Sequence, residues 1–248
     1  MKLLVTDAVV ANLGGERVDQ LTVDGGAAKG VVVLAHGSGI AMDHEYMNNL
    51  SKLFNECGLK VVRFEFPFMA KRRSTGKKGF PDKMPVLLAT YLAVIKEVLS
   101  LPENDSLPLY LAGKSLGGRV ATLIAAYMHP TTSCSQLNST FSELPITDKV
   151  TVNGVFVYGY PFHSIKKPAQ LRIEHLLELA TDVYIFQGSR DKLGTREEVL
   201  GYPLSQRVKI QWFEDADHDL KPRVKSGYTQ KQYLKISAQT VAVALGGN

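Results

Sequence analysis

A single serine, Ser115, lies between two glycines in the stretch GKSLG, residues 113–117, which has the pattern G-x-S-x-G. An apolar segment, residues 108–113, precedes it, and an alanine-rich segment of helical period, residues 116–128, follows it. Between a strand and a helix, this pattern forms a sharp turn that lifts the serine hydroxyl above the sheet. Glycines at this spacing could also simply end a strand, but the flanking segments favour the sharp turn. Ser115 is therefore the predicted nucleophile.

A serine hydroxyl needs a histidine as its base, and that histidine needs a carboxylate to orient it. In the chain order typical of this turn, the acid and then the histidine follow the serine, each on a loop after a strand. Asp191 follows one predicted strand in the stretch YIFQGSRDKLG, and His218 follows the next in QWFEDADHDL. We therefore expect Ser115, Asp191 and His218 to form a catalytic triad.

Four other aspartates compete for the role of the acid, namely Asp182, Asp215, Asp217 and Asp219. The first begins a predicted strand, so it belongs at the opposite edge of the sheet from the serine. The other three are close to His218 in sequence, and such neighbours seldom present their side chains to each other in triad geometry. Taken alone, the segments around Asp191 and His218 also resemble an ordinary turn and a solvated acidic loop. Their combination with the GKSLG turn favours Asp191 as the acid.

A third element of such a site is a pair of backbone N–H groups that bind a developing oxyanion. The stretch LAHGSGI ends a predicted strand, and its glycines can turn backbone N–H groups toward the space above Ser115. We expect the N–H of Ser38, or alternatively that of Gly39, to act together with the N–H of Leu116. Each donor of this kind contributes roughly 3 kcal/mol to transition-state stabilisation.

The other histidines are not assigned to chemistry. In its His-Gly turn, His36 is more typical of a side chain that hydrogen-bonds local backbone than of a base. The remaining four have no carboxylate or cysteine at metal-ligand spacing; they are His44, His129, His163 and His175. The sequence predicts no metal site and calls for no cofactor.

Short apolar segments alternate with segments of helical period throughout the chain. Six stretches have the composition of buried strands: 30–39, 60–67, 108–113, 152–161, 182–189 and 207–217. Four have the periodicity of helices: Glu45 to Cys57, Val86 to Leu101, Leu116 to Met128, and Gln230 to Leu245. Strands separated by helices predict an α/β fold, a mostly parallel twisted sheet with helices on both faces.

Composition sets the class of protein. The 248 residues, 45% of them hydrophobic and without repeats or a long linker, suit one domain spanning 1–248. Two cysteines, Cys57 and Cys134, are too few for a disulfide framework, which indicates a reduced, cytoplasmic protein. The N-terminal stretch has no convincing signal cleavage site. No window approaches about 18 consecutive apolar residues, which disfavours a membrane span.

Two segments depart from this alternation. Residues 69–83 are basic and predicted to form a loop after a strand, where loops of a parallel sheet border the ligand. Residues 130–149 are rich in Ser and Thr and follow a helix, so they belong at the opposite edge. Only the first segment is placed to touch a substrate.

The segment after the strand at 154–158 is too short for a cap domain, since only about twenty residues precede the next strand. We expect it to form a short apolar wall beside the serine, facing residues from the loop after Pro67. The wall would consist of Tyr160, Pro161 and Phe162, opposite Phe68 and Met69. Such a shallow pocket favours short acyl chains, because each buried methylene contributes only about 0.8 kcal/mol. Three basic residues on the facing loop would favour an anionic substrate: Lys71, Arg72 and Arg73.

Seven stretches carry a resemblance to a known family: AHGSG, RFEFPF, LAGKSLGGR, GYPFH, LRIEHL, FQGSRDKLGTREEV and DADHDL. Together they resemble a small group of the α/β-hydrolase superfamily that includes the testis-expressed and chromatin-complex (non-specific lethal) hydrolase-like domains and, more remotely, dienelactone hydrolases. The similarity extends from Gly30 to Ala244. It implies an α/β-hydrolase fold without a large cap and a triad of Ser115, Asp191 and His218. The segment 130–149 departs from the group and contains none of these residues.

The residues and the resemblance favour a serine hydrolase that cleaves a small-molecule ester or thioester through an acyl-enzyme. The alternative is a non-catalytic binding or scaffold protein with the same fold, but a scaffold has no need of all three triad residues. Nucleic-acid binding would rest only on the net charge of +5 and on one basic cluster, which is more typical of a solvated loop. That cluster is Lys71, Arg72, Arg73, Lys77, Lys78 and Lys83.

Overall fold

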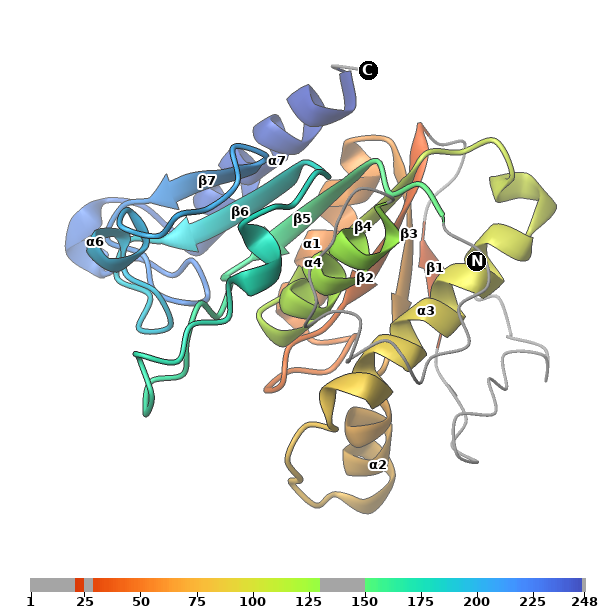
Figure 1. Cartoon of the computed structure of the whole chain (residues 1–248), viewed down its shortest axis with the longest axis horizontal. Helices are drawn as coiled ribbons and strands as arrows, with labels where there is room; N and C mark the ends of the chain where they lie inside the picture. Colours follow the sequence, from red (N-terminus) through yellow and green to blue (C-terminus); the bar gives the residue numbers. More distant parts are fainter. Residues whose placement is uncertain (1–20, 25–28, 130–149, 247–248) are drawn as a thin grey trace.

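The computed structural model describes residues 21–24, 29–129 and 150–246. A seven-stranded sheet runs through it in the order β1-β3-β2-β4-β5-β6-β7 (Figure 1). The strands are β1 (Leu21–Asp24), β2 (Gly30–Ala35), β3 (Leu59–Phe64), β4 (Leu109–Lys114), β5 (Gly154–Tyr158), β6 (Val183–Gly188) and β7 (Val208–Phe213). Strands β2 to β7 are parallel, and β1 pairs antiparallel with β3 at the edge. The mostly parallel sheet is confirmed, with β1 as an additional strand that the sequence analysis missed.

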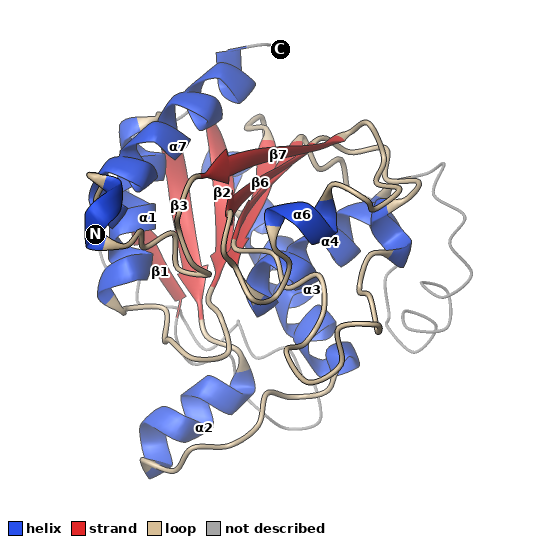
Figure 2. Ribbon diagram, turned by 90° about the vertical axis from the view of Figure 1, so that its left-hand side faces the viewer, coloured by secondary structure: helices blue, strands red, loops and turns tan. Residues whose placement is uncertain are grey.

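Helices cover both faces of the sheet, as expected (Figure 2). The α-helices are α1 (Glu45–Glu56), α2 (Pro67–Thr75), α3 (Met84–Ser100), α4 (Leu116–Met128), α6 (Arg196–Val199) and α7 (Gln230–Gly246). The described part of the chain also contains three short 3₁₀ helices, η1 (Pro102–Asn104), η2 (Glu174–Leu176) and η3 (Val224–Ser226). Apolar residues of α1 and α7 pack in one core cluster, and those of α3 and α4 pack in a second cluster. No helix in the described part of the chain is long and apolar enough to cross a membrane.

The central strands are buried along their whole length. Alternate side chains of β2 enter opposite clusters: Val31 and Val33 face α3 and α4, whereas Val32 and Leu34 face α1 and α7. This two-sided burial explains why the strands are continuous apolar segments in the sequence instead of alternating polar and apolar residues. The buried central strands therefore support the loops at the carboxyl edge of the sheet.

The basic segment 69–83 differs from the predicted loop, because its first part belongs to α2. Pro67 occupies the first turn of this helix, where its missing N–H costs nothing. The carboxylate of Asp82 accepts the N–H of Phe68 at 2.8 Å and so satisfies another unpaired donor of that turn. Gly76, with a φ of 69°, ends the helix, and residues 77–83 form the loop. The capping group is 14 residues away in sequence, which explains why local patterns did not reveal the helix.

The strand order places a topological switch point at the carboxyl edge. From β2 the chain proceeds to β3 on one side, and β4 lies on the other side of β2. Loops that leave β2 and β4 therefore diverge, and such a switch point is where α/β sheets bind ligands. Between β5 and β6 the described chain contains only η2 and loops, and no separate cap domain is evident in it. The segment 130–149 and Cys134 lie outside the described residues.

Candidate active site

Ser115 occupies a strained turn between β4 and α4. Its φ of 53° and ψ of −113° lie outside the regions that L-residues ordinarily adopt. A Cβ atom on Gly113 would lie 2.3 Å from the carbonyl carbon of Gly117, and one on Gly117 would lie 2.5 Å from the carbonyl oxygen of Ala35. Both contacts are with backbone, which cannot give way. The two glycines are therefore required because β4, α4 and the end of β2 approach each other so closely.

Three side chains from three loops form one hydrogen-bonded chain. The Oγ of Ser115 lies 2.8 Å from Nε2 of His218, and Nδ1 of His218 lies 2.7 Å from Oδ2 of Asp191. Asp191 is completely buried, whereas the serine and the histidine are partly exposed. Since Asp191 is held away from water, its carboxylate can orient the imidazole, while the serine hydroxyl remains within reach of a small molecule.

Asp191 is held by groups that the sequence analysis missed. Its Oδ2 accepts a second hydrogen bond, at 2.9 Å, from the side-chain amide of Gln187, and its Oδ1 accepts the N–H of Leu193. Gln187 is itself completely buried at the end of β6, and its Oε1 accepts the N–H of Tyr160 at 2.8 Å. The signal in the sequence is a single amide at the end of the apolar strand VYIFQG. Gln187 therefore fixes the carboxylate of Asp191 and links it by hydrogen bonds to the segment that follows β5.

The histidine loop is held by a buried lysine that the sequence analysis also missed. Lys114 Nζ donates to the backbone carbonyl of His218 at 2.9 Å and lies 3.0 Å from Oδ1 of Asp219. Lys114 is only 2% exposed, and this burial lowers the pKa of its ammonium group, opposed by the charge of Asp219. A lysine directly before the serine, at the end of a buried strand, was the available signal. The residue next to Ser115 therefore positions the loop that carries His218.

The four competing aspartates have other partners. Asp182 lies at the amino end of β6 and, like Asp215, pairs with arginine side chains. Asp217 accepts backbone N–H groups of its own turn, and Asp219 pairs with the buried lysine. Both ring nitrogens of His218 are already engaged by the serine and by Asp191. Of the five aspartates, Asp191 is therefore the one that contacts the His218 ring, and its role as the acid stays a prediction.

The loop after β2 lies directly beside the serine. A Cβ atom on Gly37 would lie 3.6 Å from Cβ of Ser115, and Ser38 and Gly39 follow as exposed residues. The first turn of α4 begins at Leu116, where helix geometry leaves backbone N–H groups without intrahelical partners. The loop and the helix start therefore flank the serine hydroxyl.

His36 has the structural role that the sequence analysis favours. Its Nε2 accepts the N–H of Phe66 at 3.0 Å, so the proton is on Nδ1, which lies 2.7 Å from the carbonyl oxygen of Gly37. Burial lowers the pKa of this imidazole, which favours its neutral form. His36 thereby fixes the loop after β2 against the chain that enters α2. Within the described residues, no group of three His, Cys, Asp or Glu side chains is arranged to hold a metal ion.

The expected apolar wall is not exposed, which corrects the sequence prediction. Tyr160 and Phe162 are completely buried, and Pro161 is buried between them. The hydroxyl of Tyr160 donates to the carbonyl of Arg172 at 2.6 Å, which draws the ring inward. Phe162 packs closely on the backbone at Gly194. These side chains support the core beneath the loops and offer no surface to a substrate.

The facing side of the expected pocket is also different. Phe68 and Met69 pack in the core cluster with α3 and α4 and are less than a tenth exposed. Arg73 forms ion pairs with Asp43, at 2.9 Å, and with the buried Glu65, at 2.5 Å. The helical geometry of α2 turns these groups toward the protein. Arg73 therefore anchors α2 instead of extending toward a substrate.

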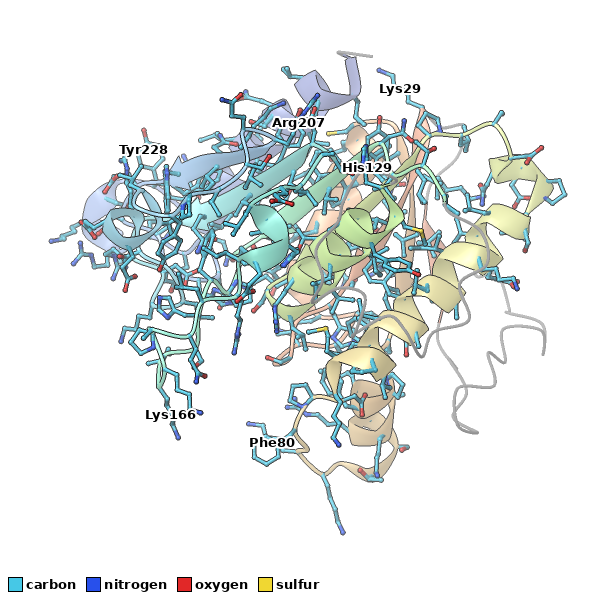
Figure 3. All side chains as sticks on the ribbon, in the orientation of Figure 1. Lys29, Phe80, His129, Lys166, Arg207 and Tyr228 are labelled. Atoms are coloured by element: carbon cyan, nitrogen blue, oxygen red, sulfur yellow. The ribbon has the colours of Figure 1, made fainter. Side chains whose placement is uncertain are left out.

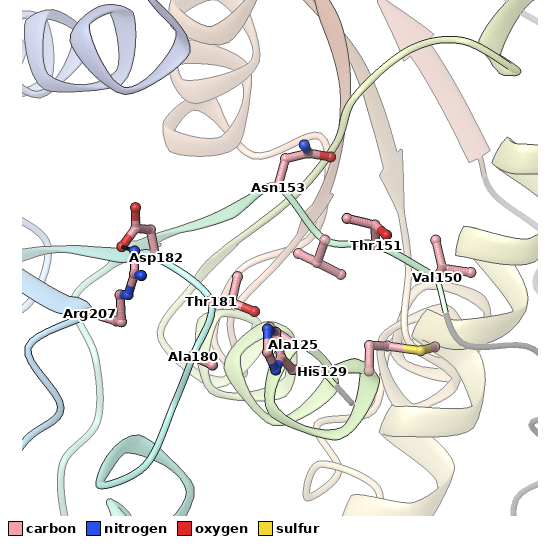
Figure 4. Close-up of a pocket in the computed structure, with 11 residues that line it drawn as sticks. Ala125, His129, Val150, Thr151, Asn153, Ala180, Thr181, Asp182 and Arg207 are labelled. Carbon is pink, nitrogen blue, oxygen red and sulfur yellow. Dashed lines mark hydrogen bonds and ion pairs between the residues drawn. The ribbon is translucent and has the colours of Figure 1, made fainter. Parts of the chain in front are cut away.

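A separate pocket of about 540 Å³ lies at the opposite end of the sheet (Figure 4). It is lined by the end of α4 and by residues that precede β5, β6 and β7. Its polar groups include Thr151, Thr181, and the ion-paired Asp182 and Arg207. This pocket is at the amino ends of the strands, whereas the hydrogen-bonded chain around Ser115 is at their carboxyl ends.

Some known proteins resemble this chain in sequence, and others resemble it in fold. Caffeoylshikimate esterase of Arabidopsis thaliana is 27% identical over 193 residues, which cover 71% of this chain and 55% of that protein. This chain thus spans about half the length of that curated relative. Dienelactone hydrolase of Anabaena variabilis superposes with a TM-score of 0.64 at 16% identity, over 92% of this chain and 91% of that one. An α/β serine hydrolase without a lid, from Xanthomonas campestris, gives 0.54 at 16% identity, over 92% and 87%.

These structural similarities show the fold alone, because sequence identities this low do not establish a shared function. The match to a family is broader: residues 28–245 fit the model of a family described as an alpha/beta hydrolase domain. The matched range contains both the switch-point loops and the hydrogen-bonded chain from Asp191 to Ser115. It does not test the narrower resemblance to the testis-expressed and chromatin-complex group, which stays a prediction. The chain belongs to the alpha/beta hydrolase domain family.

Proposed function

We propose that this protein is a serine hydrolase that cleaves a small ester or thioester, with Ser115 as nucleophile, His218 as base and Asp191 as the orienting acid. The observation that carries the proposal is the hydrogen-bonded chain through these residues, with distances of 2.7 and 2.8 Å. The relative that is named an esterase supports an ester as the substrate class.

The geometry supports an acyl-enzyme mechanism. Nε2 of His218 accepts the Oγ proton of Ser115 as Oγ attacks the carbonyl carbon, and Asp191 stabilises the imidazolium. The tetrahedral intermediate then expels the alcohol or thiol, which takes the proton from His218. Water attacks the acyl-enzyme after losing a proton to the same nitrogen. The acid leaves, and the serine hydroxyl is restored.

The N–H groups of Leu116 and Ser38 are proposed to hold the oxyanion. Leu116 begins α4, whose positive dipole end favours negative charge at this point. The loop of Ser38 and Gly39 is fixed beside Ser115 by the hydrogen bonds of His36. Donors that are already oriented need no rearrangement when the charge develops, which is the main source of their catalytic effect.

The strain at Ser115 favours an enzyme over a binding or scaffold protein. A non-glycine residue in a sparsely populated backbone conformation costs about 1–3 kcal/mol and persists only where its surroundings enforce it. Here close glycine contacts, a buried lysine and a buried glutamine all maintain the geometry. A protein that only bound a partner through its surface would gain nothing from this arrangement.

Labelling with a fluorophosphonate probe tests the proposal. We expect the probe to modify Ser115, identified by peptide mass mapping, and Ser115→Ala to abolish both labelling and turnover with the melting temperature retained. Ser100→Ala, at an exposed serine near the end of α3, should behave as wild type. 4-Nitrophenyl esters from acetyl to palmitoyl, and matching thioesters, would define the acyl group. We expect short chains to be preferred, because Tyr160 and Phe162 are buried and offer a long chain little apolar surface.

Two outcomes contradict the proposal. One is the absence of labelling under conditions that label a control esterase. The other is labelling at a different residue, with turnover that survives in Ser115→Ala. In either case the hydrogen-bonded chain would have to be interpreted as structural.

A further inference from the structure

Two arginines near the triad have no acidic partner among the described residues. Arg119 lies in the first turns of α4, and Arg172 lies in the loop between β5 and η2. Both side chains are partly exposed, so they are accessible to a small molecule. Arg73, Arg190 and Arg207, by contrast, form ion pairs with carboxylates within 4 Å.

Arg119 is directly connected to the nucleophile turn. Its backbone N–H donates to the carbonyl of Ser115 at 3.0 Å, so the two residues are one helical turn apart. Side chains of an α-helix tilt toward its N-terminus, which here is the end that carries the serine. The Nε–H of Arg119 is buried and has no hydrogen-bond partner within the described residues. A donor left in this state is costly unless a ligand satisfies it.

Arg172 is hydrogen-bonded to the segment that follows β5, and this segment contacts His218. Its N–H donates to the carbonyl of Phe162 at 2.8 Å, and its own carbonyl accepts the hydroxyl of Tyr160 at 2.6 Å. Tyr160 follows Gly159, where an added Cβ would lie 3.1 Å from Nδ1 of His218. The two arginines are therefore attached to the two segments that carry or touch the serine and the histidine.

The charges of the two guanidinium groups act on common neighbours, and neither group forms an ion pair with a carboxylate of the described residues. Burial, and then the charge of Arg119, lowers the pKa of Arg172. Both groups act on the hydroxyl of Tyr160, as does the exposed Glu174, which forms no ion pair with either arginine in the described structure. Burial, and then Arg119, lowers the pKa of His175 to about 3, so this imidazole is neutral. An anion placed between the arginines would relieve their mutual repulsion.

We propose that Arg119 and Arg172 form a subsite for a carboxylate group carried by the ester substrate. The planar guanidinium presents paired N–H donors that match the two oxygens of a carboxylate. Partial burial strengthens such contacts, because water competes for them less effectively. The inference rests on the proposed esterase function and adds a substrate class to it: esters whose acyl or alcohol portion bears a negative charge.

Pairs of esters that differ by one carboxylate test the subsite. For the acyl side, 4-nitrophenyl hemisuccinate is compared with 4-nitrophenyl butyrate. For the alcohol side, 3-carboxy-4-nitrophenyl butyrate is compared with 4-nitrophenyl butyrate. We expect wild type to have a higher kcat/KM for one of the two carboxylate esters than for its neutral counterpart. The ester pair that shows this preference identifies whether the arginines bind the acyl or the alcohol portion of the substrate.

Arg119→Gln and Arg172→Gln should each lower kcat/KM for the preferred anionic ester about tenfold or more, the loss expected for one charge-assisted hydrogen bond. Turnover of 4-nitrophenyl butyrate should change less than about threefold, since it makes no such bond. Arg207→Gln, which removes the same charge at the opposite edge, should leave the preference intact. Arg119→Lys serves as a second variant if Arg119→Gln does not fold.

A binding measurement separates failure of the subsite from failure of the proposed function. Calorimetric titration of 4-nitrophenyl hemisuccinate and 4-nitrophenyl butyrate into Ser115→Ala requires no turnover. The hemisuccinate should bind more tightly than the butyrate. In the double variant that also carries Arg172→Gln, this difference in affinity should disappear. This result in a protein that no fluorophosphonate labels would reject the serine-hydrolase proposal and retain the subsite. Equal binding and equal turnover of charged and neutral esters, or equal losses for both in the arginine variants, would overturn the subsite.

Discussion

The two edges of the sheet differ in what they contain. The amino edge has a pocket of about 540 Å³, and its charged groups, such as Asp182 and Arg207, form ion pairs near the surface. The carboxyl edge has a strained serine, a hydrogen-bonded histidine and a buried aspartate. In Figure 3, His129 and Arg207 lie in the upper part of the molecule, whereas Phe80 and Lys166 project from the lower part.

This difference shows that the described pocket and the hydrogen-bonded residues around Ser115 lie at different edges of the sheet. Catalysis of acyl transfer requires a few groups held in fixed geometry, and the substrate needs only access to them. At the carboxyl edge, Lys114 and Gln187 are buried to maintain that geometry. At the amino edge, no comparable hydrogen-bonded chain links the described pocket residues. We therefore assign the chemistry to the carboxyl edge, and paired variants at the two edges can test this assignment.

The largest contrast is expected for aspartates. Asp191→Asn should lower kcat about 10⁴-fold, because an amide favours the wrong imidazole tautomer while the packing is kept. Asp182→Asn, at the amino edge, should leave kcat unchanged, since Asp182 only pairs with surface cations. Esterase kinetics on both variants, with melting temperatures as a check on folding, measure the contrast. A large loss in Asp217→Asn together with a small loss in Asp191→Asn would show that the acid is misassigned.

A smaller contrast is expected for lysines. Lys114→Met removes the hydrogen bond to the carbonyl of His218, and the loosened histidine loop should lower kcat about ten- to a hundredfold with KM nearly unchanged. Lys209→Met, at an exposed lysine paired with Asp182, should have no effect on kcat. The split between kcat and KM distinguishes this positioning role from a general loss of structure.

Lys114→Arg keeps the charge and should recover part of the rate. If Lys114→Met and Lys114→Arg are equally impaired, or if KM rises while kcat is kept, the lysine does not act through the histidine loop. A fluorophosphonate labelling rate that is normal in Lys114→Met would also contradict the positioning role.

Sequence patterns predicted that Ser115, His218 and Asp191 would lie together, because each of these residues stands in a recognisable local sequence pattern. The G-x-S-x-G turn depends on residues next to one another, and the glycine contacts found at Gly113 and Gly117 follow from that turn alone. Asp191 and His218 each follow a recognisable strand, and the chain order arranges them. The sheet, with helices on both faces, was predictable from its continuous apolar strands for the same reason.

The errors concern where side chains point after a strand ends. Tyr160 and Phe162 were expected to line a pocket, but a hydrogen bond to Arg172 and packing on Gly194 hold them in the core. Arg73 was expected to face the substrate, but it pairs with Asp43 and Glu65 from other loops. These contacts join residues far apart in sequence, which no local pattern encodes.

The two edges also differ in their buried titratable groups. His36 and Lys114 are buried at the carboxyl edge, His175 is buried against α4, and burial lowers the pKa of each. The Nε2 of His175 lies 2.9 Å from Oγ1 of Thr122, on α4. Since the pKa of this histidine is about 3 in the folded protein and 6.5 in the unfolded chain, only the unfolded state gains a proton between these values. Its contribution to stability is complete above pH 6.5 and is lost as the pH falls toward 3.

The smallest predicted effect is therefore on acid stability. In His175→Gln, the free energy of unfolding should fall less steeply between pH 6 and 4 than in wild type, by up to about 1.4 kcal/mol per pH unit, which is the slope of one proton. Urea unfolding at a series of pH values measures this slope. Thr122→Val breaks the same hydrogen bond but keeps the imidazole, so it should lower stability at neutral pH and retain the wild-type slope. If His175→Gln and wild type show the same slope, the acid sensitivity arises from other groups, and burial of His175 does not make the protein sensitive to acid.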